Sequence, residues 1–114
     1  KAGMTVAIEP FVTDGGGYVI NGKPGNIVVI ARDKEVEDPK TKEFLDYAKG
    51  EFHALPFCAR SCDFPKAELY VKKLLRLGVL SSFSQLIEVN KGTVTQHEYT
   101  FYIDGARGEI TTAP

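Results

Sequence analysis

Two glutamates are the residues of this sequence whose type and placement could do chemistry. Glu9 follows the alternating stretch "MTVAI", and Glu98 lies inside "TVTQHEYTFYI". Carboxylate oxygens are ligands for hard divalent cations, and strands hold a side chain more rigidly than loops do. With 15 acidic residues in the chain, two glutamates are a weak signal by themselves. The alternative for Glu98 is the solvated face of an ordinary antiparallel strand.

The segments around Glu9 have β character and turn signals. Residues 4–9 alternate between two faces, which predicts a strand that ends where Pro10 removes a backbone donor. The stretch "VTDGGGYVING", residues 12–22, has three consecutive glycines and a final Asn-Gly, which predict a turn or hairpin. No Gly-Lys-Ser/Thr follows the glycines, so a phosphate-binding loop is not indicated. Residues 26–33 form a short apolar run that favours a buried strand.

The middle of the chain, from about residue 38 to residue 78, is predicted to be helical. Asp38 is expected to cap a first helix with Pro39 in its first turn. Asp63 or Phe64 is expected to cap a second helix, with Pro65 in its first turn and Gly78 at its end. A further short helix is expected after Pro56, between the two.

Period-two patterning returns after this helical middle. Residues 79–89 and 93–103 predict two strands joined as a hairpin by the turn "NKG", and residues 108–112 predict a final short strand. Strands at both ends and helices in the middle make the predicted fold class α+β.

Composition limits the kinds of partner this chain could have. It has 43% hydrophobic and 25% charged residues over 114 positions and a formal net charge of -1, values typical of one globular domain without a strong field for nucleic acid or lipid. It contains no run of about 18 apolar residues and no signal sequence, so no membrane association and a cytoplasmic location are expected. The two cysteines, Cys58 and Cys62, are too few for a disulfide framework, and idle thiols are expected.

Four stretches, in this order and at these separations, carry a resemblance to a known family: "AIEPF", "LPF", "LLRLGVL" and "TQHEYTFYI". Together they resemble the C-terminal part of type II methionine aminopeptidases, particularly archaeal ones, over essentially the whole chain. The resemblance implies part of a pita-bread fold with a winged-helix-like helical insert. It places catalytic strands at residues 1–26, the insert at residues 27–90 and the last catalytic strands at residues 91–114.

The resemblance also implies a role for particular residues. Glu9 would ligate one of two divalent metal ions, and Glu98 would bridge both. Gln96, two residues before Glu98 on the same face of the predicted strand, could orient one of these ligands. Manganese, iron or cobalt would suit such a carboxylate-rich site, and zinc is also compatible. The family usually has an aromatic residue before the bridging glutamate and a histidine after it, whereas His97 and Tyr99 stand here. Altered packing is expected from this exchange more than a lost ligand.

Three residues of the predicted insert match positions that line the family's methionine side-chain pocket. They are Phe83, Pro56 and Ile27, of which Phe83 could equally be an ordinary core aromatic.

The activity implied is removal of the N-terminal methionine from nascent polypeptides. The family's two aspartates, its metal-binding histidine and its catalytic histidine have no counterpart here, so we expect a C-terminal fragment that is inactive alone and holds no metal. Its expected partners are the missing N-terminal half of the catalytic domain and the nascent chain, and its uncovered strand edges favour self-association.

A rival interpretation is a winged-helix module that binds nucleic acid or the ribosome, with the following hairpin as a wing. It rests on four basic residues of the second predicted helix: Lys66, Lys72, Lys73 and Arg76. Nucleic-acid binding is not expected, because such charge runs are usually solvated helix faces and the net charge of -1 supplies little affinity for phosphate.

Overall fold

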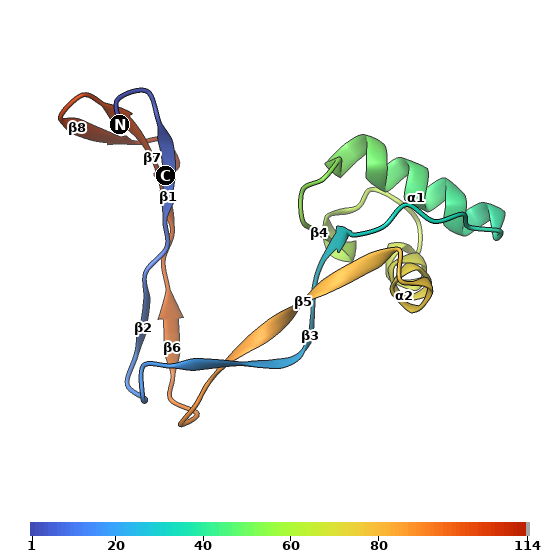
Figure 1. Ribbon diagram of the computed structural model, residues 1–114, viewed down its shortest axis with the longest axis horizontal. Helices are drawn as coiled ribbons and strands as arrows, with labels where there is room; N and C mark the ends of the chain where they lie inside the picture. Colours follow the sequence, from blue (N-terminus) through green and yellow to red (C-terminus); the bar gives the residue numbers. More distant parts are fainter. Residues whose placement is uncertain (114) are drawn as a thin grey trace. The chain divides into compact units, whose positions relative to one another are not determined.

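The computed structural model describes residues 1–113, and this part of the chain forms two compact units. We call Lys1–Ile20 together with residues 86–113 the strand unit, and Asn21–Gln85 the helical unit. Strands dominate the first and both α-helices lie in the second (Figure 1). The predicted α+β class is therefore confirmed at the level of element types.

In the strand unit, two antiparallel ladders follow one another along a long two-stranded ribbon (Figure 1). The first pairs β1 (Thr5–Ile8) with β7 (Tyr99–Asp104), and β8 (Arg107–Ile110) adds to the other edge of β7. The second pairs β2 (Phe11–Thr13) with β6 (Val94–Gln96). In every pair of both ladders the two residue numbers add to 107, so one register runs through the ribbon.

The ribbon is interrupted where the two ladders meet. Pro10 has no amide hydrogen to donate, and neither Glu9 nor Pro10 is assigned to a strand. The His97 amide still donates to the Pro10 carbonyl at 3.3 Å, which keeps the shared register across the gap. The strand predicted at residues 4–9 is confirmed as β1, which ends at Ile8, two residues before the proline.

The helical unit combines a three-stranded sheet with two helices. The strand order is β4 (Phe57–Cys58), β3 (Val19–Ile30), β5 (Leu80–Glu88). Strands β3 and β5 also extend into the strand unit at one end. The helices are α1 (Pro39–Phe52) and α2 (Ala67–Leu77), with a single 3-10 turn, η1 (Ala59–Ser61), between β4 and α2.

Helix α1 begins as its sequence predicts. The Asp38 carboxylate accepts the backbone amide of Thr41 at 3.2 Å, and Pro39 is the first helical residue. The Thr41 hydroxyl also bonds to this carboxylate, and Lys73 of α2 donates to it at 2.9 Å. One cap thus also ties α1 to α2.

Helix α2 ends as predicted but begins later. Gly78 closes it in the left-handed region, φ 67°, where its amide bonds to carbonyls of the last turn. The start predicted at Asp63 or Phe64 is wrong, because Lys66 at φ 60° precedes the first helical residue, Ala67. Pro65 consequently lies before the helix and not in its first turn.

Two local predictions are corrected by pairing between distant segments. The hairpin predicted from residues 79–89 and 93–103 does not form: β5 pairs with β3, while β6 pairs with β2. The Asn-Gly at residues 21–22 lies inside β3, where strand pairing overrides the local turn preference. The short helix expected after Pro56 is present as the 3-10 turn η1, which follows the two-residue strand β4.

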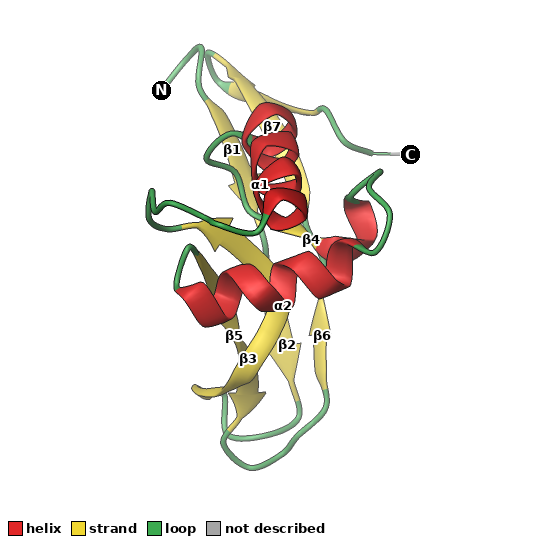
Figure 2. Ribbon diagram, turned by 90° about the vertical axis from the view of Figure 1, so that its right-hand side faces the viewer, coloured by secondary structure: helices red, strands yellow, loops and turns green. Residues whose placement is uncertain are grey.

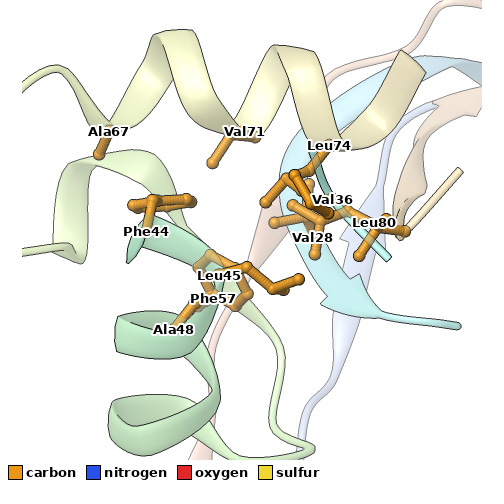
Figure 3. Packing of buried hydrophobic residues seen from close by; sticks show 11 residues of the cluster. Val28, Val36, Phe44, Leu45, Ala48, Phe57, Ala67, Val71, Leu74 and Leu80 are labelled. Carbon is orange, nitrogen blue, oxygen red and sulfur yellow. The ribbon is translucent and has the colours of Figure 1, made fainter. Parts of the chain in front are cut away.

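The apolar core lies entirely in the helical unit. Phe44, with no exposed surface, stacks on Tyr70 with ring centroids 5.6 Å apart. Figure 3 shows side chains of α1 and α2 converging with those of the sheet strands. The helices run in different directions across this core (Figure 2). The buried apolar residues are Val28, Val36, Phe44, Leu45, Ala48, Phe57, Ala67, Val71, Leu74, Val79 and Leu80.

Candidate metal and substrate site

The ribbon of the strand unit brings Glu9 and Glu98 face to face. The shared register makes position 9 the cross-strand partner of position 98, although 89 residues separate them in the sequence. Directly opposed residues of an antiparallel pair point to the same side, with Cβ atoms about 4.5 to 5.5 Å apart. Both side chains are exposed. The ribbon therefore offers two carboxylates to one ligand on one side.

Gln96 lies beside this pair. Its side-chain amide donates to a carboxylate oxygen of Glu9. Gln96 is the partner of Phe11, two positions beyond Glu9 on the neighbouring strand, so this hydrogen bond places Glu9 on the same side of the ribbon as Gln96. The contact fixes one oxygen of Glu9 and leaves the other free for a ligand.

His97 and Tyr99 lie one position on either side of Glu98. Alternation along a strand directs them to the opposite side. Their rings meet edge to face with centroids 4.4 Å apart. They therefore pack against each other behind Glu98, and His97 is not directed at the carboxylates.

These residues fit part of a divalent metal site. Opposed carboxylates repel each other across a strand pair, and a cation between them would remove that repulsion. No lysine or arginine within residues 1–113 forms an ion pair with either glutamate. The same residues contain no group of three or more His, Cys, Asp or Glu side chains arranged to hold a metal ion. The two glutamates are thus suited to contribute ligands to a site that other donors complete.

The three residues expected in a substrate pocket all lie in the helical unit. Phe83 on β5 and Ile27 on β3 are about half exposed, at 50% and 49%, and Pro56 is exposed just before β4. Phe83 is therefore not a buried core aromatic. Its backbone passes close to β3: a Cβ on Gly25 would lie 2.9 Å from the Phe83 carbonyl oxygen.

A separate hollow of about 400 Å³ lies in the helical unit between β3 and α2. Its lining includes Val28, Val71, Leu75, Lys72 and the thiol-bearing Cys58. Both cysteines are free and partly buried. The Ser61 hydroxyl lowers the pKa of Cys58, whereas burial raises the pKa of Cys62.

Glu88 is a residue that the sequence patterns did not single out. It is 4% exposed, and its two carboxylate oxygens accept four backbone amides from two loops. The available signal was an acid immediately before the "VNKG" turn in a chain that also carries "GGG", since both loops present unpaired amides.

The fold of the chain is found in a known structure. The structure of a thermophilic Arx1 superposes on 91% of this chain with a TM-score of 0.68, at 17% sequence identity, and the match covers 29% of that protein. This similarity supports the predicted relation to the pita-bread fold.

Sequence comparison finds homologues among the methionine aminopeptidases. Methionine aminopeptidase of Thermococcus onnurineus is 35% identical over 116 aligned residues, covering 98% of this chain and 39% of that protein. The enzyme of Saccharolobus solfataricus is 34% identical over 87% of this chain and 35% of its own length. No protein-family model matches the chain. The chain is a homologue of the archaeal methionine aminopeptidases, and it spans about two fifths of the length of the relatives it matches.

Proposed function

We propose that this chain supplies the C-terminal part of a methionine aminopeptidase, the enzyme that removes the first methionine of nascent polypeptides. The observation that carries the proposal is the cross-strand pair Glu9 and Glu98 in a chain homologous to these enzymes over 98% of its length. The relatives are longer than this chain, so the remaining donors would come from a segment matching the rest of their length.

In this proposal Glu9 and Glu98 hold divalent cations, and Gln96 orients Glu9 through its hydrogen bond. Carboxylate oxygens suit manganese, iron, cobalt or zinc. When bound, such a cation polarises a peptide carbonyl and activates water. Both carboxylates lie where the ribbon is interrupted, between the β1–β7 and β2–β6 ladders, so the strands on either side position them and leave their free oxygens in reach of the ligand. Phe83, Pro56 and Ile27 would line the space for the methionine side chain.

The helical unit is proposed to be the winged-helix-like insert of type II enzymes. Its compact range, Asn21–Gln85, overlaps the residues 27–90 assigned to the insert from the sequence. Residues 1–26 and 91–114 would then belong to the catalytic domain. No helix within residues 1–113 is long and apolar enough to cross a bilayer. A cytoplasmic location, where nascent chains are made, is part of the proposal.

The winged-helix nucleic-acid interpretation is less well supported. Lys73, one of its four basic residues, is paired with Asp38 at 2.9 Å. The hairpin that would act as a wing does not form, because β5 and β6 pair with different strands. Duplex DNA titrated at low and moderate salt should show no saturable, steeply salt-dependent binding.

The test joins this chain to the segment by which the Thermococcus onnurineus relative exceeds it. With manganese or cobalt, the fusion is expected to release methionine from a Met-Ala peptide, whereas residues 1–114 alone are not. In the fusion, Glu98→Gln should lower the rate by roughly a hundredfold or more, because a ligand is lost. Glu109→Gln, an exposed β8 glutamate, is the matched control and should leave the rate unchanged. Methionine release by the chain alone, or full activity of folded Glu98→Gln, would refute the proposal.

A further inference from the structure

The strand unit contains one buried carboxylate with no cationic partner among residues 1–113. Glu88, at the end of β5, is 4% exposed. One oxygen accepts the amides of Gly16 at 2.5 Å and Gly17 at 3.1 Å. The other accepts Asn90 at 2.7 Å and Gly92 at 2.9 Å. Burying a charge is costly unless hydrogen bonds compensate it, and four amide donors satisfy this one.

The two loops approach this carboxylate more closely than side chains would allow. A Cβ on Gly15 would lie 2.4 Å from the Glu88 carboxylate, and a Cβ on Gly92 would lie 2.6 Å from the Gly15 backbone. Close packing around an internal anion therefore explains Gly15 and Gly16, whereas Gly17 has open space around it and is explained by its φ of 77°. The amides of Gly16 and Gly17 donate to this carboxylate and the amide of Gly15 donates to the Thr13 hydroxyl at 3.0 Å, so all three already have acceptors within the chain.

The two loops that bond to Glu88 lie at the end of the ribbon formed by β2 and β6. Strand β2 ends at Thr13 and β6 begins at Val94, and these two residues form the last pair of the ladder. Just beyond them the Thr93 amide donates to Asp14 at 2.8 Å, and the Glu88 contacts follow. Whatever holds the two loops together therefore also holds the end of the β2–β6 ladder.

Apart from the loops, the β2–β6 ladder is held in register by its continuity with the β1–β7 ladder across the His97–Pro10 hydrogen bond. It consists of three pairs, and none of its side chains is buried. Register is weakly specified where neither strand face is covered, and a slip of one residue would turn every side chain to the other face. In the observed register Gln96 reaches Glu9 and position 98 faces position 9.

We propose that Glu88 is a positioning residue for the two candidate metal ligands. By holding residues 16–17 against residues 90–92 it fixes the β2–β6 register, and that register places Gln96 on Glu9. The inference rests on the proposed function for the ligand role of Glu9 and Glu98. The coupling from Glu88 to Gln96 is a property of the strand unit that needs neither metal nor substrate.

The test uses the 114-residue chain labelled with nitrogen-15, without metal or peptide, so it does not depend on the proposed function. Amide exchange is measured at Gly16, Gly17, Asn90 and Gly92, with exposed Gly105 as an internal reference. In the wild type these four amides should exchange at least about tenfold more slowly than Gly105, as expected for buried, charge-assisted hydrogen bonds. If the four amides exchange as fast as Gly105 in the wild type, Glu88 does not hold the two loops together and the inference is overturned.

The variant Glu88→Gln keeps the shape of the side chain but turns one acceptor into a donor that faces amide donors. It should remove the protection of the four amides and shift the Gln96 side-chain amide signals toward those of Glu9→Ala, which removes the acceptor of the Gln96 hydrogen bond. Glu109→Gln, with the same chemical change on an exposed residue, should move neither.

The Gln96 signals separate positioning from a merely structural role. If Glu88→Gln frees the four loop amides but leaves the Gln96 signals at their wild-type positions, Glu88 only holds the loops and the inference is wrong. If both change while the fusion enzyme described above proves inactive, the positioning role stands and the proposed function fails. If Glu88→Gln brings the signals of the whole strand unit to random-coil positions, Glu88 is needed for folding and not specifically for the register, and the inference is wrong.

Discussion

The two units of this chain are stabilised in different ways. The helical unit buries eleven apolar side chains between two helices and a sheet. In the strand unit, no apolar residue among residues 1–20 and 86–113 is buried, and Glu88 is the one buried side chain. Large apolar residues such as Phe11, Val12 and Tyr18 are more than half exposed there. The helical unit thus has an apolar core of its own from which to fold. The strand unit relies on strand pairing and on the hydrogen bonds to the Glu88 carboxylate.

This difference in packing agrees with the proposed function, in which the strand unit carries the metal ligands. Exposed apolar strand faces indicate surfaces that another segment covers. Relatives more than twice as long as this chain would contain such a segment. The strand unit carries the two glutamates, and their proposed site also needs further donors. Incomplete packing and an incomplete ligand set thus occur in the same unit.

The largest expected effect on stability is in the helical core. Phe44→Ala removes a fully buried ring that packs on three other aromatic rings. It should cost about 3 to 5 kcal/mol in the free energy of unfolding, measured by urea denaturation with far-UV circular dichroism. Phe11→Ala in the strand unit, where the ring is 56% exposed, should cost less than about 1 kcal/mol. Similar costs for both would contradict the contrast between the units.

Acid should loosen the strand unit by protonating the Glu88 carboxylate. The Gly92 amide and the other three hydrogen bonds lower the pKa of Glu88 in the folded chain. A lowered folded pKa stabilises the fold at pH values above the unfolded pKa, and this contribution is lost as pH falls through the folded value. Exchange at Gly16 and Gly92 should therefore accelerate by roughly tenfold or more, relative to Gly105, as the hydrogen bonds are lost below the usual glutamate range.

The matched control for this pH dependence removes the other acid in the loops. Asp14, which accepts the Thr93 amide, is replaced by asparagine in both proteins, so that only Glu88 titrates there. In Asp14→Asn alone the acid transition should persist. In Asp14→Asn with Glu88→Gln the relative exchange of these amides should be flat with pH, and a persisting transition would assign it to another group.

A smaller effect is expected at the end of α2. Gly78 has φ 67°, a conformation that costs other residues about 1 to 2 kcal/mol, so Gly78→Ala should destabilise the helical unit by about that amount. Gly50, inside α1 with open space around its Cβ position, is the matched control. Gly50→Ala should stabilise the unit by roughly 0.5 to 1 kcal/mol, because alanine is the better helix former. Destabilisation by both changes would count against this account.

The smallest expected effect comes from removing the strand unit. Residues 21–85 expressed alone retain the whole apolar core and should unfold cooperatively. Their melting temperature should lie within about 5 °C of the helical-unit transition in the full chain, a shift that corresponds to roughly 1 kcal/mol. A non-cooperative melt of residues 21–85 would show that the strand unit is needed for the core.

Local sequence signals predicted where helices and strands form better than they predicted which strands pair. Asp38 with Pro39 and Gly78 marked the start of α1 and the end of α2, because capping depends on residues that are neighbours in the chain. Lys66 in the left-handed region was missed, since no local preference favours lysine there. The hairpin of β5 with β6 was also wrong, because strand pairing depends on distant segments.

The sequence by itself indicated the resemblance to methionine aminopeptidases, the strands on either side of Glu9 and Glu98 and the presence of two helices in the middle of the chain. These properties depend on motifs and on the period of each element, which are local. Only the tertiary structure decided that positions 9 and 98 are opposite each other, that the strand unit lacks an apolar core, and that the glycine loops close on Glu88. Each of these follows from pairing and burial between residues tens of positions apart, which no local pattern specifies.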